Sequence, residues 1–455
     1  MTTEKLLNLL PAPLQQKLDT IINGDGDSQK SQRGALLAFI IRIASAAIAF
    51  FSQVLLARWI GAHEYGVFTY VWVWINIIGI LCAAGFATSV VRFVPEYLQS
   101  GKNDLVRGFI HTGRWFSFIM GLVASLAGFA LLYLFEDSVS EYYRVPAAIA
   151  LIALPAFSLT DFQDGVGRSQ GWIDLALVPP YIIRPFLLFT FIGGAVAIGW
   201  SKNAETAVYA AIAATWITVV LQYLMQKKRM ANAVPSGARQ YKFKFWLKVS
   251  LPVIAIESFA LMMTNMDILL LDLFVPPDQI AVYFAAARTI ALIAFVHFSV
   301  TAAVTPKFTT LYAEGDIEGL RGFLNESRKW TFIPSLIGGI VLLTLGKPIL
   351  WLFGSEFMVG YPAMFALVVG LLARSFAGPL QGLMIATGQQ NTAAMAMGSV
   401  VLVNLAFNLL LIPRFGLVGA ATATAISFSI ESLLLYVAAR RVLSHPPTLK
   451  PEGSV

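Results

Sequence analysis

Four arginines lie within segments that are otherwise apolar enough to cross a membrane: Arg42, Arg184, Arg288 and Arg374. A guanidinium group is costly in hydrocarbon, so each of these side chains is expected to face a protein-lined interior and not lipid. A guanidinium also matches phosphate oxygens through two parallel hydrogen bonds. The four arginines therefore predict that the chain carries an anionic substrate through a membrane.

The composition is typical of a chain that crosses a membrane many times. Of its 455 residues, 57% are hydrophobic and 13% are charged, whereas about 25% of the residues of a soluble domain are charged. The apolar residues come in runs of about 20, the length of helix that crosses a bilayer. We therefore predict an all-α integral membrane protein with twelve transmembrane helices. The predicted spans cover residues 34–57, 66–91, 115–135, 146–167, 173–200, 207–225, 249–275, 280–305, 331–353, 357–387, 392–412 and 417–439.

The positions of lysine and arginine predict the orientation of these spans. With the N-terminus in the cytoplasm, 23 of the 32 basic residues fall in cytoplasmic segments, and the other nine fall in external loops or within spans. Such an excess on one side follows the positive-inside rule. The sequence thus predicts an even number of spans with both termini in the cytoplasm. The net charge of +7 reflects this topology and contact with anionic lipid, not nucleic-acid binding.

The sequence also repeats itself. The tetrapeptide RGFI before the third span returns as RGFL before the ninth span, 214 residues later, and Arg114 and Arg328 keep the same offset. Six spans in each half predict a parallel repeat of two six-helix lobes, related by an axis along the membrane normal. The predicted parts are a cytoplasmic N-terminal tail (1–33), an N-terminal lobe (34–226), a basic linker (227–248), a C-terminal lobe (249–439) and a cytoplasmic C-terminal tail (440–455).

The first span carries a polar face in addition to its arginine. Ser45, Ser52 and Gln53 follow Arg42 at spacings of 3, 10 and 11 residues, which places them on or near one side of a helix. The repeat puts Glu257 at the equivalent position of the second lobe. We predict that Arg42 and Glu257 face a central cavity and pair when its inner mouth closes. A static ion pair is the alternative.

Three further carboxylates within or beside the spans have alternative roles. Asp267 lies at the edge of the face that begins at Glu257, where gating or coupling is the predicted role. Asp161 and Asp164 lie three residues apart at the end of the fourth span. They either bind a coupling cation or proton, or neutralise Arg184 or Arg168.

The two remaining arginines lie where a helix is expected to break. Arg184 stands between Pro179-Pro180 and Pro185 in the fifth span, and Arg374 stands close to a Gly-Pro pair in the tenth. Proline frees backbone carbonyl groups and breaks or kinks a helix. Each arginine therefore either binds substrate or satisfies the freed carbonyls.

Four segments resemble the polysaccharide-export flippases of the multidrug/oligosaccharidyl-lipid/polysaccharide exporter superfamily. These segments are residues 56–68 (LARWIGAHEYGVF), 267–283 (DILLLDLFVPPDQIAVY), 385–388 (IATG) and 411–424 (LIPRFGLVGAATAT). The resemblance extends over residues 34–439. It departs from the family pattern at Asp272, where glycine is usual, and at Pro276-Pro277, where Gly-Pro is usual.

The resemblance implies the exporter fold of this superfamily and a substrate. That substrate is an oligosaccharide linked to polyprenyl diphosphate, flipped across a bacterial inner membrane by alternating access. It also implies that arginines of the first and eighth spans, here Arg42 and Arg288, hold the diphosphate. From the residues alone, the alternative is that Arg288 is a packing arginine capped by carbonyl groups. Partners would be membrane lipids and polysaccharide polymerase or export proteins.

The sequence also bears on functions other than flipping of a lipid-linked oligosaccharide. No nucleophile–base pair, metal-ligand cluster or phosphate-binding loop stands out in the sequence, so we expect no enzyme activity, cofactor or metal. A cation-coupled multidrug exporter of the same superfamily is the first alternative, and it would have an acid-rich cavity. A membrane scaffold that transports nothing is the second. Whether a proton or Na⁺ drives transport is left open by the sequence.

Overall fold

The computed structural model describes residues 27–444, except for the side chains of residues 27–40, 42, 43 and 256. Every regular element in this part of the chain is a helix. The first half contains α3 (Asp27–Ile60), α4 (Ala62–Cys82), α5 (Phe86–Gln99), α6 (Asn103–Leu134), η1 (Glu136–Ser138), α7 (Glu141–Ala150), η2 (Leu151–Ala153), α8 (Leu154–Ser169), α9 (Ile173–Val178), η3 (Pro179–Ile183), α10 (Arg184–Ala197) and α11 (Ala204–Ala233). The second half contains α12 (Phe243–Leu271), α13 (Pro277–Ala313), α14 (Ile317–Thr344), α15 (Gly346–Phe353), η4 (Ser355–Gly360), α16 (Tyr361–Ala377), α17 (Leu380–Ala386) and α18 (Gln390–Ser444).

Helices of membrane-spanning length run through the whole described region. Nine of them, within residues 27–444, are long and apolar enough to cross a membrane, or ten when the pair α14 and α15, bent by 62°, is taken as one span. The helix α3 adds a shorter apolar stretch, Ala44–Ile60. The helix α18 is interrupted at Gly416, whose φ of 53° and ψ of −128° are not helical, so it divides where the eleventh and twelfth spans were predicted to meet. The fold class is confirmed, and the count of twelve stays a prediction.

The predicted break in the fifth span is a π-helical turn. Between α9 and α10, residues Pro179–Ile183 form η3, a π-helix. A π turn adds one residue to a helical turn and thereby accommodates the hydrogen bond that proline cannot make. As a result, a new α-helix, α10, begins at Arg184, with Pro185 in its first turn.

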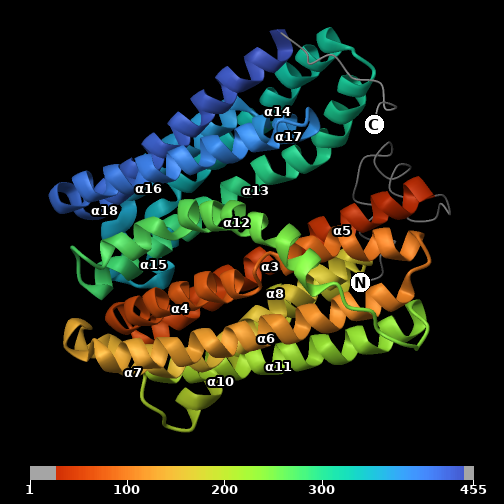
Figure 1. Cartoon of the computed structure of the whole chain (residues 1–455). Coiled ribbons are helices and arrows are strands. Elements are labelled where there is room, and N and C mark those ends of the chain that lie inside the picture. Colours follow the sequence, from red (N-terminus) through yellow and green to blue (C-terminus); the bar gives the residue numbers. More distant parts are fainter. Residues whose placement is uncertain (1–26, 445–455) are drawn as a thin grey trace, which may run out of the picture.

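The helices gather in two groups that correspond to the two halves of the sequence (Figure 1). One hydrophobic cluster spans both groups and includes Tyr65 and Phe68 of α4, Tyr283 and Phe284 of α13, and Phe357 of η4. Since α4 and α13 begin at these residues, the shared cluster lies toward the end of the bundle where both helices start. The predicted lobe boundaries differ from the helix ends. The helices α11 and α12 extend into the predicted linker and leave only residues 234–242 between them.

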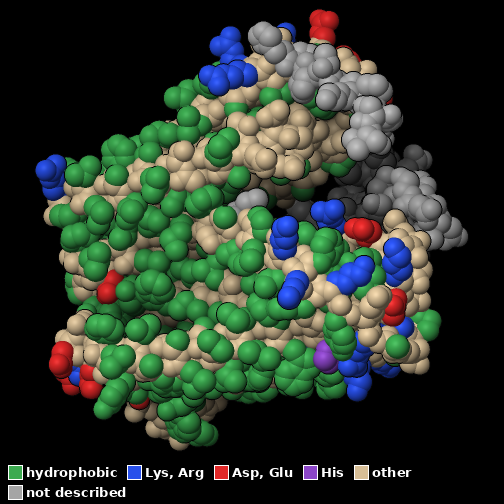
Figure 2. Space-filling model, in the orientation of Figure 1, with side chains coloured by type: hydrophobic (Ala, Val, Ile, Leu, Met, Phe, Trp, Pro, Cys, Tyr) green, Lys and Arg blue, Asp and Glu red, His purple; other side chains and the backbone are tan. Residues whose placement is uncertain are grey.

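Toward the other end of the bundle each half has a hydrophobic cluster of its own. In the first half, Phe86 and Phe109 pack with Trp246 at the beginning of α12. In the second half, Phe308 and Leu383 belong to a separate cluster. Lys and Arg side chains gather at this end, where α6 begins and α11 ends, and the surface is hollowed between the two halves (Figure 2). We call it the basic end, and the end where α4 and α13 begin the opposite end.

Candidate functional site

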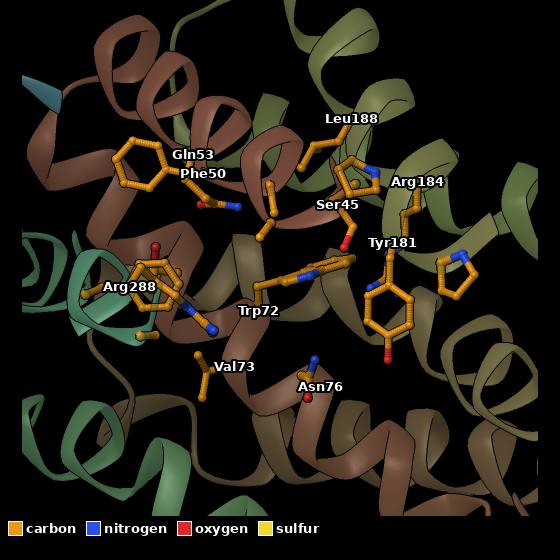
Figure 3. Close-up of a pocket in the computed structure, with 18 of the residues that line it drawn as sticks. Ser45, Phe50, Gln53, Trp72, Val73, Asn76, Tyr181, Arg184, Leu188 and Arg288 are labelled. Carbon is orange, nitrogen blue, oxygen red and sulfur yellow. The ribbon is translucent and has the colours of Figure 1, made fainter. Parts of the chain in front are cut away.

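A cavity of about 500 Å³ lies between the two halves. The helices α3, α4, η3, α10 and α11 of the first half and α12 and α13 of the second contribute to its walls. Figure 3 shows Arg288 and Arg184 on opposite sides of this cavity, with Trp72 between them. Cavities of this size hold small ligands or the head of a larger one.

The predicted polar face of the first span lines this cavity. Ser45 and Gln53 of α3 belong to its wall, and the carboxamide oxygen Oε1 of Gln53 accepts a hydrogen bond of 2.8 Å from the Tyr65 hydroxyl. That bond fixes the carboxamide at the wall of the cavity. Arg42 precedes Ser45 by less than one turn of the same helix, but its side chain lies outside the described residues.

Arg288 enters the cavity from α13 and is solvent-accessible there. Its guanidinium carbon lies 4.7 Å from the centre of the Phe284 ring, one turn earlier in the helix. Among the described residues it has no carboxylate in an ion pair and no carbonyl acceptor. Its capacity to bind an anion is therefore not used within the described part of the protein.

Arg184 enters from the other side, immediately after the π-helical turn. Its guanidinium carbon lies 4.9 Å from the centre of the Phe157 ring. Within residues 27–444 it makes no hydrogen bond to the carbonyls that the prolines free. The Ser52 hydroxyl instead lies 3.5 Å from the carbonyl oxygen of Pro185. The structure therefore does not support the alternative that Arg184 only satisfies these carbonyls.

The electrostatic character of the cavity follows from its lining. Arg184 and Arg288 are the charged residues among the described lining residues, and none of those residues is Asp or Glu. Gln53, Asn76 and Asn265 supply neutral hydrogen-bonding groups, and most of the remaining surface is aromatic or aliphatic. Two cations with apolar surroundings and no described counter-ion form a site for an anion, because electrostatic attraction strengthens where water is scarce.

Comparison with known proteins agrees with this arrangement. The family model of polysaccharide biosynthesis proteins matches residues 31–312, which is more than half of the chain. The chain belongs to this family. A second model, MatE, matches residues 252–410.

Individual proteins extend the similarity over most of the chain. The probable low-salt glycan biosynthesis flippase Agl15 of Haloferax volcanii is 23% identical over 407 residues, which cover 88% of this chain and 82% of the relative. An inward-facing multidrug resistance transporter of the MATE family has a TM-score of 0.73 at 16% identity, over 89% of this chain and 98% of that one. The lipid II flippase MurJ in an inward closed conformation has a TM-score of 0.71 at 16% identity, over 89% and 87%. The MATE-like fold predicted from the sequence is confirmed.

The fourth predicted arginine of this family member lies outside the central cavity. The guanidinium nitrogen Nη2 of Arg374 lies 3.4 Å from the carboxylate oxygen Oε1 of Glu431, which is buried. Both residues line a separate, small pocket that also includes His297. Arg374 therefore has a carboxylate partner within the second half, unlike Arg184 and Arg288.

Asp267 lies in a buried polar cluster of the second half and not at the wall of the cavity. Its carboxylate oxygen Oδ2 accepts hydrogen bonds from the hydroxyls of Tyr283 and Thr424, each 2.5 Å long. Its oxygen Oδ1 accepts a bond of 3.1 Å from the Asn408 carboxamide. The side chain thereby joins α12, α13 and α18. Its predicted role in gating or coupling stays a prediction.

The other three predicted gating or coupling residues lie close together near the basic end. Asp161 of α8 is within electrostatic range of Asp164, Glu257 and Arg168. Arg168 pairs with Asp164 at 3.3 Å, which is one of the two alternatives for that aspartate. Glu257 accepts a hydrogen bond of 2.5 Å from the Thr88 hydroxyl of α5. We call Asp161, Asp164 and Glu257 the acid cluster.

The contribution of α4 to the cavity was not predicted from the sequence. Thr69, Trp72, Val73 and Asn76 line it together, at the spacing of 3, 4 and 7 residues that marks one face of a helix. The same periodicity revealed the polar face of α3. In α4 the signal is weak, because many neighbouring residues are also aromatic or β-branched and, of these four, only Asn76 is strongly polar.

Proposed function

We propose that this protein flips an oligosaccharide linked to a polyprenyl diphosphate from one membrane leaflet to the other. The observation that carries the proposal is the pair Arg184 and Arg288 in a cavity without a carboxylate among its described lining residues. Membership of the polysaccharide biosynthesis family and the similarity to Agl15, a probable glycan flippase, support the same substrate class.

In this proposal the two arginines hold the diphosphate. Each guanidinium presents paired N–H donors to phosphate oxygens, and the rings of Phe284 and Phe157 hold the two guanidinium groups in place from one side. Arg42, on the polar face of α3, is a third candidate for the same role. Sugars next to the diphosphate would contact Gln53 and Asn76, while the polyprenyl tail stays in lipid.

Alternating access supplies the translocation step. The cavity first opens toward the basic end, which we assign to the cytoplasm by the positive-inside rule, and then toward the opposite end. A membrane potential that is negative inside would assist the outward movement of an anion by about 2.3 kcal/mol per charge per 100 mV. We place the protein in a bacterial inner membrane or its archaeal counterpart, since Agl15 comes from a haloarchaeon.

The acid cluster is our candidate for ion coupling. Asp161, Asp164 and Glu257 bring three carboxylates together with one arginine, Arg168, between two helices of the first half and α12 of the second. Close carboxylates bind a proton or a cation more readily than isolated ones. If a proton or Na⁺ drives transport, replacing Asp161 by Asn will make flipping independent of the gradient of that ion.

A cation-coupled multidrug exporter is the competing function, and the similarity to a MATE transporter and the MatE match are its support. A pump for cationic drugs would place acidic groups where Arg184 and Arg288 lie. The charge of the cavity therefore favours the flippase. We propose that the protein transports a substrate and does not catalyse a reaction. If Arg184 and Arg288 prove necessary for flipping, the alternative of a membrane scaffold that transports nothing is excluded.

The test is the accumulation of lipid-linked sugars in a strain that lacks the gene. We expect the wild-type protein to remove the accumulated diphosphate-linked oligosaccharide, and Arg288→Ala to fail at equal protein abundance. Arg288→Lys should restore part of the function, because lysine keeps the charge without the bidentate geometry. Lys307→Gln is the matched control: Lys307 is an exposed residue at the basic end of the same helix. Normal flipping by Arg288→Ala, or altered sensitivity to cationic dyes without lipid-linked sugar accumulation, would contradict the proposal.

A further inference from the structure

A second cavity lies in the first half, at the basic end and apart from the central one. Its volume is about 570 Å³. The walls come from α6, α8, α11 and the segment 234–242 that joins α11 to α12. Nothing in the proposed flipping cycle uses it. Its polar and aromatic lining includes Arg107, His111, Arg114, Trp115, Trp216 and Arg239.

The cavity carries positive charge that has no counter-ion among its described lining residues. It contains three arginines and no Asp or Glu. Arg107 has a structural role, because its guanidinium donates to the carbonyl oxygens of Ala238 at 2.7 Å and Pro235 at 2.6 Å and thereby fixes the joining segment. Arg114 and Arg239 form no ion pair with any residue of the described chain. Two arginines are therefore available to an anion.

Arg114 is oriented for a ligand by its own neighbours. Its guanidinium carbon lies 4.9 Å from the centre of the Tyr223 ring, and its Nη2 lies 3.3 Å from the Gln226 carboxamide oxygen. Its Nε atom is buried and has no hydrogen-bond partner within the described residues. Buried N–H groups are nearly always paired in native structures. A ligand cannot reach this buried atom, but Nη1 of Arg114 is not buried and has no hydrogen-bond partner among the described residues, so it can donate to an anion in the cavity.

The internal repeat provides a comparison within the same chain. Arg328 is the counterpart of Arg114, and its guanidinium carbon lies 5.1 Å from the ring centre of Tyr436, in the same kind of contact. Its Nε atom, however, donates to the carbonyl oxygen of Ala377 at 3.0 Å, and its Nη1 lies 3.3 Å from the Asn325 carboxamide oxygen. The second copy is thus satisfied by the protein itself, whereas the first copy is not.

Apolar side chains of the cavity wall are exposed at the surface of the helix bundle, where we expect lipid. Trp115 is 55% exposed and Val220 is 50% exposed, and Phe118 and Trp216 line the cavity between them. Tryptophan at the end of a transmembrane helix marks the depth of the lipid headgroups. A ligand that reaches the arginines along this surface would carry a phosphate at one end and hydrocarbon at the other.

We propose that this cavity binds an anionic membrane phospholipid, with its phosphate between Arg114 and Arg239 and its acyl chains along Phe118 and Val220. Since Arg239 belongs to the segment between the two halves, the bound lipid would tie that segment to α6 and α11. The site is independent of the flipping substrate, and its test does not require transport.

The test is lipid binding to the full chain in detergent, measured by native mass spectrometry. The probes are dioleoyl phosphatidylglycerol, dioleoyl phosphatidylcholine and inorganic phosphate. We expect phosphatidylglycerol to bind more tightly than phosphatidylcholine. Arg239→Gln should weaken phosphatidylglycerol binding about fivefold, and the pair Arg114→Gln with Arg239→Gln about 25-fold, at the electrostatic contribution typical of one arginine near anionic lipid. Arg239 is exposed, so its single variant keeps the test valid if the double variant does not fold.

The matched control is Lys244→Gln. Lys244 is exposed near the start of α12, five residues after Arg239, and does not line the cavity. Its replacement removes the same charge from the basic end and should leave phosphatidylglycerol binding unchanged. Equal binding of the two lipids, or an equal loss in Lys244→Gln, would overturn the proposal in favour of unspecific attraction. Displacement of the lipid by millimolar inorganic phosphate would overturn the lipid assignment and indicate a site for free phosphate.

Discussion

The two ends of the bundle differ in how its halves meet. At the opposite end a single hydrophobic cluster runs through both halves, and polar bonds reinforce it. Arg58 of α3 donates to the carbonyl oxygens of Leu352 at 2.7 Å and Trp351 at 2.6 Å, and Tyr143 of α7 donates to Asp272 at 2.6 Å. At the basic end the second half has a hydrophobic cluster of its own, and the surface is hollowed between the halves (Figure 2).

The contacts at the opposite end therefore stabilise the conformation that the structure has. The two halves pack on each other at the opposite end, and the surface is hollowed between them at the basic end. We infer that the cavity with Arg184 and Arg288 opens toward the basic side in this state. To open the other way, the halves must separate where α4 packs on α13, and new contacts must form at the basic end. Each contact at the opposite end therefore stabilises this state relative to the other by its own free energy.

The largest expected effect comes from Gly66, at the closest approach of the halves. A Cβ atom at this position would lie 1.8 Å from the carbonyl oxygen of Pro277, so Gly66→Val must separate α4 from α13. Overpacking of this kind costs about 1–3 kcal/mol or more, which should open the opposite end in a large fraction of molecules. The reporter is Ala291→Cys in the cavity, labelled by a membrane-impermeant maleimide from the side of the opposite end. The one native cysteine, Cys82, is buried.

Gly322→Val is the control for this prediction. Gly322 also lies in a helix, α14, but a Cβ atom there would have no atom within 4 Å. It should leave the labelling rate unchanged. If Gly66→Val and Gly322→Val label the reporter equally slowly while both proteins remain folded, the contact between α4 and α13 does not control access.

Much of the cavity could be predicted from the sequence. The spacing from Ser45 to Gln53 is a local property of one helix, and both residues line the cavity. Glu257, which was predicted to face the cavity, is not among its described lining residues. The three prolines correctly predicted a break beside Arg184, although not its π-helical form. Arg288 was expected at the cavity because of its cost in hydrocarbon and the family resemblance. The first two inferences depend on residues within one span, and the third adds the resemblance to a family.

The rest depends on contacts between distant segments, which one sequence does not show. In the sequence, Asp272 departs from the family pattern without an explanation. The structure shows that it accepts a hydrogen bond from Tyr143, which lies 129 positions away. The ion pair of Arg374 with Glu431 and the polar cluster around Asp267 also join residues that are distant in the sequence. The open basic end is a property of how the two lobes meet, and neither lobe alone determines it.

The second prediction concerns the hydrogen bond between Tyr143 and Asp272, which joins the two halves at the opposite end. Tyr143→Phe removes the donor and keeps the ring among Tyr70 and Tyr142. A hydrogen bond to a charged group contributes about 2 kcal/mol, so Tyr143→Phe and Asp272→Asn should each speed labelling of the reporter, by up to about 30-fold. In the double variant the two effects should fall well short of additive. Fully additive effects would show that the two side chains act independently.

A smaller effect is expected from Arg58, which is exposed. Its guanidinium also lies 4.8 Å from the ring centre of Trp351. Exposed contacts of a charged side chain contribute about 1 kcal/mol or less, so Arg58→Gln should speed labelling no more than about fivefold. High salt should reproduce part of the effect in the wild-type protein. If Arg58→Gln speeds labelling as much as Gly66→Val does, the contacts of Arg58 would be the main ones that keep the opposite end closed.

The smallest effect is expected from a substitution at the basic end. The hydroxyls of Ser250 and Ser89 form a hydrogen bond of 2.8 Å between the beginning of α12 and α5, within the part of the bundle where Trp246 packs into the first half. Ser250→Ala should lower stability in detergent by about 0.6 kcal/mol, the average for such bonds in membranes. It should not change labelling of the reporter, because the beginning of α12 would move together with the first half. Faster labelling in Ser250→Ala would instead place a moving boundary between α12 and α5, and the segment 234–242 that precedes α12 would then have to bend during the transport cycle.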